Sequence, residues 1–543
     1  MENRKIIHLE EPNTLSNFLT KEERENIVSL KITGFMGRKD FEDVLDDMCD
    51  TFGEYDDDDD YTPDYELSPS LRHLDMGEAT YVDGDCLPYF GFHTLLETAI
   101  LPQGIKSTLE DGETALSEAE NLHTQVLPSG LKTVGGFNSC PKLTGLILPE
   151  GLEVIGSHAF CGCDSITSIR IPASVKEMYG SSFAGCNITA YEVDDCNPYY
   201  TAVEGVVYSK DLQTLVAFPT DYPIKHYKVP AGTKRIGSEA FMFSHVDTVE
   251  LPQGLTTIEY GAFECSDILS IEIPDSVIKV EEMAFSFCTK LKHKVISKGL
   301  KEIPQQMIES CSELKILEIP SNVKVVHYSA LAWSRDLERL ILHDGLEEIA
   351  DDGVLMTYEG QLREVFLPKT LKKVPGGVFN YSPFIKSFQL NPANPYFSVV
   401  DGALCSKDKK VLYSVPDYNR TSCKVPEGIE VIEEKIFAFL PKLHTIELPS
   451  TLRVIKARAF QGCKSLRKIE IPAGVEKVDI GALWADNLKT VVMESPDPPE
   501  MTGNVKDDDW RYKETTLLVP PDAVATYKEA PGWKCFIVKQ KSN

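Results

Sequence analysis

The chain has 543 residues, 42% hydrophobic and 26% charged, which is typical of soluble folded proteins and argues against a disordered chain. Its formal charge of −29, from 84 acidic and 55 basic side chains, repels phosphate backbones and anionic lipid headgroups. We therefore expect no nucleic-acid partner, and no insertion into a membrane, since no stretch approaches the roughly 18 apolar residues of a membrane span.

The N-terminal segment, residues 1–84, is predicted to contain one strand and one helix. The strand is expected at Asn26–Gly34 and the helix over Asp40–Met48, with Asp40 as its N-cap. The start of the chain, Met1–Lys5, lacks the apolar region of a secretory signal. The chain is thus either cytoplasmic or the mature part of an exported protein to which a start methionine was added.

A repeat of about 23 residues occupies residues 85–495. Phe160–Phe183 shows one period, F-x-x-C-x-x-L-x-x-I-x-I-P-x-x-V-x-x-I, after which the next Phe begins a new one. The Phe-type positions are Phe90, Leu116, Phe137, Phe160, Phe183, Phe241, Phe263, Phe285, Ile308, Leu331, Leu355, Phe379, Phe437, Phe460 and Leu483. The Pro-type positions are Pro102, Pro128, Pro149, Pro172, Pro252, Pro274, Pro320, Pro368, Pro449 and Pro472. Because two independent markers keep one period, we predict about 15 turns of a solenoid.

Each period is predicted to form a short strand, which Pro stops, and a tight helical turn around the Phe. No single turn can bury its Leu, Ile and Phe alone, so neighbouring turns must stack and pair their strands into a parallel sheet. Cys140, Cys163, Cys186, Cys288, Cys311 and Cys463 share one place in the period. Since Ser takes that place in other turns, we interpret it as a small, buried packing position and not as a metal site.

Two steps of the repeat are longer, at 58 residues each, from Phe183 to Phe241 and from Phe379 to Phe437. The extra residues, at about 195–230 and 391–426, resemble each other, since both contain N-P-Y, then D/E-G, then S-K-D. An apolar, β-rich run on both sides of the Ser-Lys-Asp turn predicts a β-hairpin in each insertion.

These patterns resemble the BspA-like leucine-rich repeats of bacterial surface proteins. The resemblance rests on Leu143–Cys163, Leu443–Cys463 and the two hairpin motifs. It implies a leucine-rich-repeat solenoid of α/β-type repeats at or beyond the cell surface, acting in adhesion or host-protein binding, without catalytic residues or cofactor. It also implies that residues 1–84 form an N-terminal cap and residues 496–543 a C-terminal capping segment.

Signatures of chemistry are missing from the sequence, which contains no G-x-S-x-G, P-loop, G-x-G-x-x-G or H-E-x-x-H motif. The acidic stretches, residues 54–62 and Asp507–Trp510, have the hard oxygen ligands that calcium prefers. They lack the spaced Asn, Asp and Gly of a calcium loop, so solvated loops are the favoured interpretation.

The exposed side of the predicted sheet is mostly charged or small, with one apolar exception in four successive turns. The candidate protein-binding residues there are Val295, Ile316, Ile341 and Phe366, with Arg339 and Glu364 beside them. Clustered apolar residues with a charged rim are typical of a protein-contact patch, and the alternatives are that an inserted loop or a terminal segment covers them or that their exposure is incidental.

The favoured function is therefore a non-enzymatic, secreted or surface-exposed monomer that binds another protein through its sheet face. The alternative is a glycan-binding module that uses the aromatic residues of the two hairpins, Tyr199, Tyr200, Tyr396 and Phe397.

Overall fold

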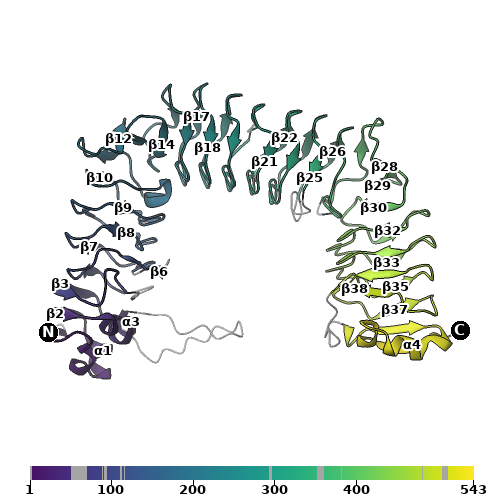
Figure 1. The fold of residues 1–543 in the computed structure, drawn as a ribbon, viewed down its shortest axis with the longest axis horizontal. Helices are drawn as coiled ribbons and strands as arrows, with labels where there is room; N and C mark the ends of the chain where they lie inside the picture. The colour runs from purple at the N-terminus through teal and green to yellow at the C-terminus, as the bar shows by residue number, and fades with distance from the viewer. Residues whose placement is uncertain are drawn as a thin grey trace. The chain divides into compact units, whose positions relative to one another are not determined.

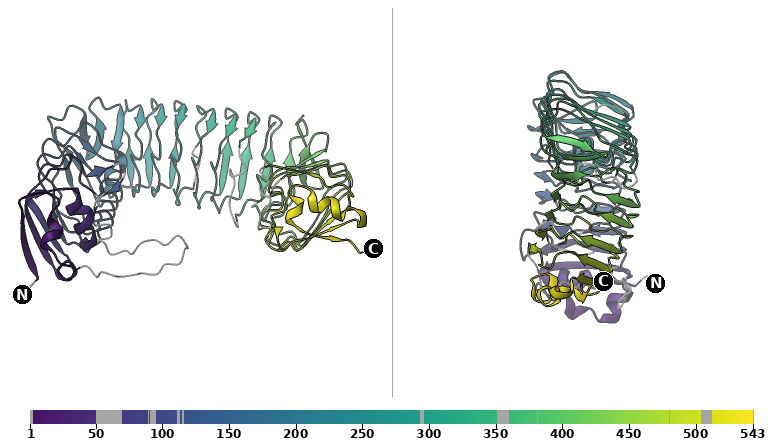
Figure 2. Two further views of the ribbon diagram at one scale, coloured as in Figure 1. Left: turned by 60° about the horizontal axis from the view of Figure 1, so that its bottom comes forward. Right: turned by 90° about the vertical axis from the view of Figure 1, so that its right-hand side faces the viewer.

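The computed structural model describes residues 3–49, 70–88, 90, 95–110, 113–114, 116–292, 296–350, 360–380, 382–479, 481–503 and 512–542. Val295 and both acidic stretches, residues 54–62 and Asp507–Trp510, lie outside these ranges. The chain divides into two compact units, Met1–Ile268 and Leu269–Asn543. Within each unit, short strands of successive turns lie side by side (Figures 1 and 2).

The first unit has two strand-bearing faces. One face carries β1 (Arg4–Leu9), β2 (Ser29–Met36), β3 (His73–Tyr81), β4 (Thr98–Ile100), β7 (Thr124–Val126), β10 (Ile169–Ile171), β11 (Tyr191–Val193), β15 (His226–Lys228) and β17 (Thr248–Glu250). The other carries β8 (Thr133–Val134), β9 (Val154–Ile155), β16 (Arg235–Ile236) and β18 (Thr257–Ile258). Its short remaining elements are η1 (Leu15–Phe18), α1 (Lys21–Asn26), α2 (Arg38–Asp40), η2 (Phe41–Leu45), α3 (Asp46–Cys49), β5 (Leu109–Glu110) and β6 (Glu113–Thr114).

The second unit repeats this plan. Its first face carries β19 (Ser270–Glu272), β22 (Ile316–Ile319), β24 (Arg339–Leu342), β26 (Glu364–Leu367), β27 (Gln389–Leu390), β31 (Ser422–Lys424), β33 (Thr445–Glu447), β35 (Lys468–Ile471), β37 (Thr490–Met493), β39 (Thr516–Val519) and β40 (Ile537–Gln540). Its other face carries β20 (Lys279–Val280), β21 (Glu302–Ile303), β23 (Val325–Val326), β25 (Glu348–Ile349), β32 (Val431–Ile432), β34 (Val454–Ile455), β36 (Lys477–Asp479) and β38 (Glu500–Thr502). Its helical elements are η6 (Pro521–Ala523), α4 (Val524–Glu529) and η7 (Trp533–Cys535).

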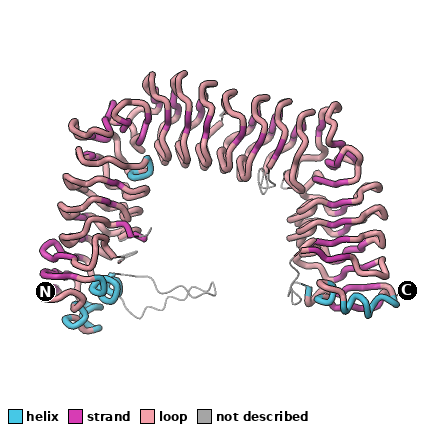
Figure 3. The backbone as a smooth tube through the Cα atoms, in the orientation of Figure 1, coloured by secondary structure: helices cyan, strands magenta, loops and turns pink. Residues whose placement is uncertain are grey.

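Turns and loops make up most of each coil (Figure 3). The Pro that ends a strand also opens a turn, since the carbonyl of Pro172, directly after β10, accepts the N–H of Val175 at 3.3 Å. The Phe segment closes in the same way, with the N–H of Cys163 on the carbonyl of Phe160 at 3.2 Å. Among the described Phe segments, a 3₁₀ helix forms only at η3 (Gly180–Phe183), and the others remain simple turns.

The Phe-type side chains form the stacked core that the repeat predicts. The rings of Phe137 and Phe160 stack with centroids 5.5 Å apart and an interplanar angle of 7°. Phe160 and Phe183 follow at 5.2 Å and 8°. The six cysteines of the repeat position are free thiols in the same core, all fully buried, as expected of a packing position.

The predicted number of about 15 turns is too small, because the described residues form about 21. The difference arises partly in the N-terminal segment, where β1 pairs in parallel with β2, β2 with β3 and β3 with β4, so that these strands add turns to the same sheet. These strands lack the Phe and Pro markers, and for that reason the repeat count missed them.

The predicted N-cap is also wrong by three residues. The helical segment begins at Arg38 with Gly37 as its N-cap, and Asp40 occupies the N3 position. The buried Asp40 carboxylate accepts three backbone N–H groups, from Gly37 at 2.8 Å, Asn13 at 2.9 Å and Leu15 at 2.8 Å. Asp40 therefore ties the helix start to the preceding loop as well as capping it from within.

Each insertion contains three antiparallel strands and not a single hairpin. They are β12 (Tyr200–Val203), β13 (Val206–Ser209) and β14 (Thr214–Ala217) in the first unit, and β28 (Phe397–Val400), β29 (Ala403–Ser406) and β30 (Val411–Ser414) in the second. The additional turns, Glu204-Gly205 and Asp401-Gly402, have positive φ at both residues, which suits a tight hairpin turn. The third strand of each insertion then pairs in parallel with β16 or β32 and returns the chain to the solenoid.

On the Phe side of the coil, the turns before and after an insertion touch directly. A Cβ on Gly180 would lie 2.4 Å from the carbonyl carbon of Glu239, and a Cβ on Gly376 would lie 2.1 Å from the carbonyl oxygen of Glu434. The Ser181 hydroxyl also donates to the Glu239 carboxylate. The extra strands are thus accommodated on the other side of the coil alone.

Candidate binding surface on the second unit

Strand register sorts the candidate residues into two rows on the sheet of the second unit. Ile316 lies opposite Arg339, and Arg339 opposite Glu364. The neighbouring row runs Glu318, Ile341, Phe366 and Gln389. The single apolar stripe expected from the sequence is therefore divided, because Ile316 belongs to the charged row. The apolar pair that remains is Ile341 and Phe366.

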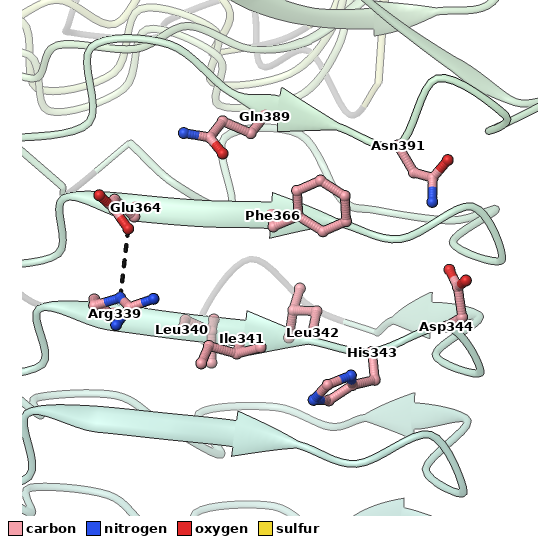
Figure 4. A pocket seen from close by; sticks show the side chains of 10 residues that line it. All are labelled: Arg339, Leu340, Ile341, Leu342, His343, Asp344, Glu364, Phe366, Gln389 and Asn391. Carbon is pink, nitrogen blue, oxygen red and sulfur yellow. Dashed lines mark ion pairs between the residues drawn. The ribbon is translucent and has the colours of Figure 1, made fainter.

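The sheet is hollowed at this pair, with a volume of about 350 Å³ (Figure 4). Ile341 is half-buried, while 43% of Phe366 is exposed. The residues that line the hollow are Arg339, Leu340, Ile341, Leu342, His343, Asp344, Glu364, Phe366, Gln389 and Asn391. Of the six candidates from the sequence, the structure thus brings four together here, namely Arg339, Ile341, Glu364 and Phe366.

An ion pair and a hydrogen bond between successive turns hold the polar side chains around the hollow. Arg339 Nε lies 3.4 Å from a carboxylate oxygen of Glu364, on one side of the apolar pair (Figure 4). On the other side, His343 Nε2 lies 2.6 Å from Glu318 Oε1. These pairs fix long side chains at the rim and leave the faces of Ile341 and Phe366 accessible.

Asp344 completes the rim through its contact with the next turn. Its carboxylate accepts the backbone N–H of Lys369 at 3.0 Å and lies 3.2 Å from the Lys369 ammonium. Hydrogen bonds from the Lys369 side chain and backbone hold the pKa of Asp344 below its ordinary value. The carboxylate therefore stays charged in mildly acidic solution.

Sequence reasoning missed the residues at the carboxyl ends of the strands. His343, Asp344 and Asn391 follow the last inward-facing residue of their turns, where the alternation of the strand no longer says which way a side chain points. The available signal was their position directly after neighbouring strands, which brings them to one edge of the sheet.

The aromatic residues of the insertions divide into two kinds. Tyr199 and Tyr396 are exposed, by 50% and 48%. Tyr200 instead donates its hydroxyl to the carbonyl of Lys176 at 3.1 Å, and the buried Phe397 packs edge-on against Tyr413 with centroids 5.4 Å apart. The first aromatic residue of each insertion is thus more exposed than the second.

Other chemistry finds little support in the described part of the chain. It holds no group of three or more His, Cys, Asp or Glu side chains placed to bind a metal ion. None of the helices described is both long and apolar enough to cross a membrane.

The model of the BspA type leucine-rich repeat region matches the chain at residues 135–200, 216–338, 295–398 and 413–497, in 6 copies. The pneumococcal vaccine antigen PcpA shares 19% identity, with a TM-score of 0.40 over 63% of this chain and 96% of that one. A leucine-rich cell surface protein from Faecalibacterium prausnitzii also shares 19%, with a TM-score of 0.44 over 64% and 95%. A leucine-rich repeat protein from Bacteroides ovatus shares 17%, with a TM-score of 0.37 over 76% and 91%. No curated protein matches the sequence.

Proposed function

The chain belongs to the BspA-type leucine-rich repeat family, and from this premise we propose that it is a non-enzymatic binding protein displayed at or beyond the cell surface. Its partner is another protein, which docks on the sheet of the second unit. The observation that carries this proposal is the hollow around Ile341 and Phe366.

The hollow has the anatomy of a small protein-contact site. An aromatic ring and an aliphatic side chain lie next to each other at its centre, and the charged rim is already ordered by the Arg339–Glu364 and Glu318–His343 pairs. Preordered rim charges limit the side-chain entropy lost on binding, while the apolar centre supplies the energy of desolvation. A protein partner with a complementary apolar knob fits this arrangement.

The proposal is tested with the Ile341→Asp, Phe366→Asp double variant of the full chain. Wild type and variant are used to capture proteins from a host-cell surface extract, and the captured partner is then purified and titrated in a calorimeter. Loss of the two central contacts, worth together about 2 kcal/mol or more, should raise the dissociation constant by at least roughly 30-fold.

The matched control is Ile147→Asp, which places the same charge on a residue between β8 and β9 of the first unit that is 80% exposed and remote in sequence from the hollow. The control should bind like wild type, and both variants should unfold at the wild-type temperature. Equal affinity of the double variant and wild type would remove the hollow as the docking site.

A further inference from the structure

The hollow of the second unit belongs to a row of side chains from four successive turns. Strand register sets Glu318 opposite Ile341, Ile341 opposite Phe366, and Phe366 opposite Gln389. Adjacent strands of a sheet lie about 4.8 Å apart, so the row extends over about 14 Å across the strands. Along it follow one carboxylate, two apolar side chains and one amide.

Two of the three carboxylates around the hollow already have a permanent cation beside them. The Arg339 guanidinium lies 3.4 Å from the Glu364 carboxylate. The Lys369 ammonium lies 3.2 Å from the Asp344 carboxylate, which also accepts the backbone N–H of Lys369. These groups therefore add little net charge to the rim.

Glu318, the third carboxylate, has a histidine as its partner. It accepts a hydrogen bond from His343 Nε2 at 2.6 Å, and a histidine ring is charged only when it is protonated. Among the described residues, no lysine or arginine lies within ion-pair distance of this carboxylate, and 42% of its side chain is exposed. Arg363, in the turn of Phe366, lies over the ring of Phe384 at 5.0 Å instead. Glu318 thus presents a negative charge at one end of the row.

Gln389 ends the row on the other side with an amide. Its side chain is exposed, lines the hollow next to Phe366 (Figure 4), and makes no hydrogen bond to another described residue. An amide presents N–H donors and a carbonyl acceptor close together, and each peptide bond of an extended chain offers the matching pair. Gln389 can therefore hydrogen-bond to the main chain of a bound segment.

The dimensions of the row favour an extended segment. The volume of the hollow, about 350 Å³, is near the lower end of the range of about 300–1,000 Å³ for ligand sites, so it admits one or two side chains and not a helix about 10 Å across. An extended chain advances about 3.3 Å per residue, and every second side chain faces the same way. Two residues, about 6.6 Å, thus bridge the distance from the apolar centre to Glu318, which is one and a half strand spacings or about 7 Å.

We propose that the docked part of the partner is an extended segment that crosses the strands along this row, with an apolar side chain two residues from a lysine or arginine. The apolar side chain packs on Ile341 and Phe366, the cation pairs with Glu318, and the Gln389 amide hydrogen-bonds to the main chain. The formal charge of −29 of the whole chain attracts such a basic segment and speeds its association. The inference rests on the proposed docking at the hollow and adds the chemistry of what docks there.

The test selects peptides from a random heptapeptide library displayed on phage, with the immobilised full chain as bait. Wild type should enrich peptides in which an aromatic or aliphatic residue stands two positions from lysine or arginine. The Glu318→Lys variant should select aspartate or glutamate at that position instead, because like charges repel. The Ile341→Asp, Phe366→Asp variant should enrich neither class, since it lacks the apolar centre.

A selected peptide is then titrated in solution against single variants of the full chain. Glu318→Gln should weaken binding about fivefold, as expected for one partly exposed ion pair. Gln389→Ala should weaken it about threefold or more through the loss of hydrogen bonds to the main chain. The matched control is Glu447→Gln, which changes the third residue of β33, as Glu318 is the third of β22, but removes a carboxylate 3.6 Å from the Lys424 ammonium. The control should bind like wild type, and all variants should unfold at the wild-type temperature.

The outcomes separate this inference from the proposed function. The inference is overturned if no peptide is enriched, if the enriched peptides lack a basic residue at the stated spacing, or if Glu318→Lys keeps the wild-type preference. The docking site itself still stands in those cases, provided that the Ile341→Asp, Phe366→Asp variant loses its protein partner. Retention of the partner by that variant removes the docking site and the inference together.

Discussion

The thiol of Cys163 donates a hydrogen bond to the carbonyl oxygen of Phe137, one turn earlier, at a sulfur–oxygen distance of 3.0 Å. The same bond joins Cys186 to Phe160 at 3.1 Å and Cys463 to Phe437 at 3.0 Å. In another turn the hydroxyl of Ser334 replaces the thiol, on the carbonyl of Ile308 at 3.1 Å. Cys and Ser thus alternate at this position because both can donate to the preceding turn.

This bond predicts unequal losses of stability for two substitutions at Cys163. Cys163→Ser keeps a donor and should cost at most about 1 kcal/mol, whereas Cys163→Val leaves the Phe137 carbonyl without its partner and should cost about 1–3 kcal/mol. Urea unfolding of both variants measures the difference. A valine variant as stable as the serine variant would show that the position selects for size alone.

Burial keeps such thiols in the donating form. Desolvation raises the pKa of Cys463 to about 12, so the group stays protonated throughout the physiological range. The buried cysteines of the repeat position should accordingly not react with thiol reagents up to pH 9 in the folded protein. They should react once the protein is unfolded.

The hydrogen bonds of Asn394 predict that its loss destabilises the insertion in the second unit. Asn394→Ala removes four hydrogen bonds of a buried amide, two donated and two accepted, and should cost about 3 kcal/mol. Asn487→Ala, which removes one exposed bond to Lys464, is the control and should cost no more than about 1 kcal/mol. Denaturant unfolding distinguishes the two, and equal losses would contradict the anchoring role.

The contact of Gly180 with the turn after the first insertion predicts that a side chain at this position destabilises the protein. A methyl group there meets the backbone of Glu239, which cannot yield as a flexible side chain would, so Gly180→Ala should destabilise the protein by about 1–3 kcal/mol. Gly130→Ala, with nothing within 4 Å of the new methyl, is the control and should be neutral or slightly stabilising. The comparison requires only thermal unfolding at one pH.

The buried carboxyl of Glu309 predicts that its contribution to the stability of the folded protein depends on pH. Burial raises the pKa of this carboxyl, opposed in part by the amide of Gln306, which donates to it at 2.7 Å. A pKa that is raised on folding contributes stability below the unfolded value, near 4.3, and loses that contribution as the pH rises. Glu309→Gln should therefore raise the unfolding temperature at pH 7, and the gain should shrink towards zero near pH 4. A gain that is independent of pH would contradict this origin.

The solenoid could be predicted from the sequence because the Phe-type and Pro-type positions recur with one period. Phe160 and Phe183 stack in successive turns, and Pro172 and Pro472 follow directly on β10 and β35 and end these strands. The family follows from the same markers. The N-terminal turns escaped prediction because β1 and β3 each pair with β2 through backbone hydrogen bonds, and these strands lack the Phe and Pro markers of the repeat.

The candidate site was predicted less completely, for reasons of register. Placing Ile316 beside Ile341 required the alignment of two strands to within two residues, and the pairing sets Glu318 there instead. The hollow also depends on His343 and Asn391, whose positions are set by loops after the strands. Alternation of apolar residues fixes which face a side chain takes, but not which neighbour it meets across the sheet.

The direct contact of Gly180 with Glu239, and of Gly376 with Glu434, has an evolutionary consequence. The turns before and after each insertion contact each other on one side of the coil. The three strands between them are therefore an addition to a solenoid that continues past them. A lineage could gain, lose or duplicate such an addition by a single in-frame recombination. Surface specificity would then change while the buried aromatic column remained intact.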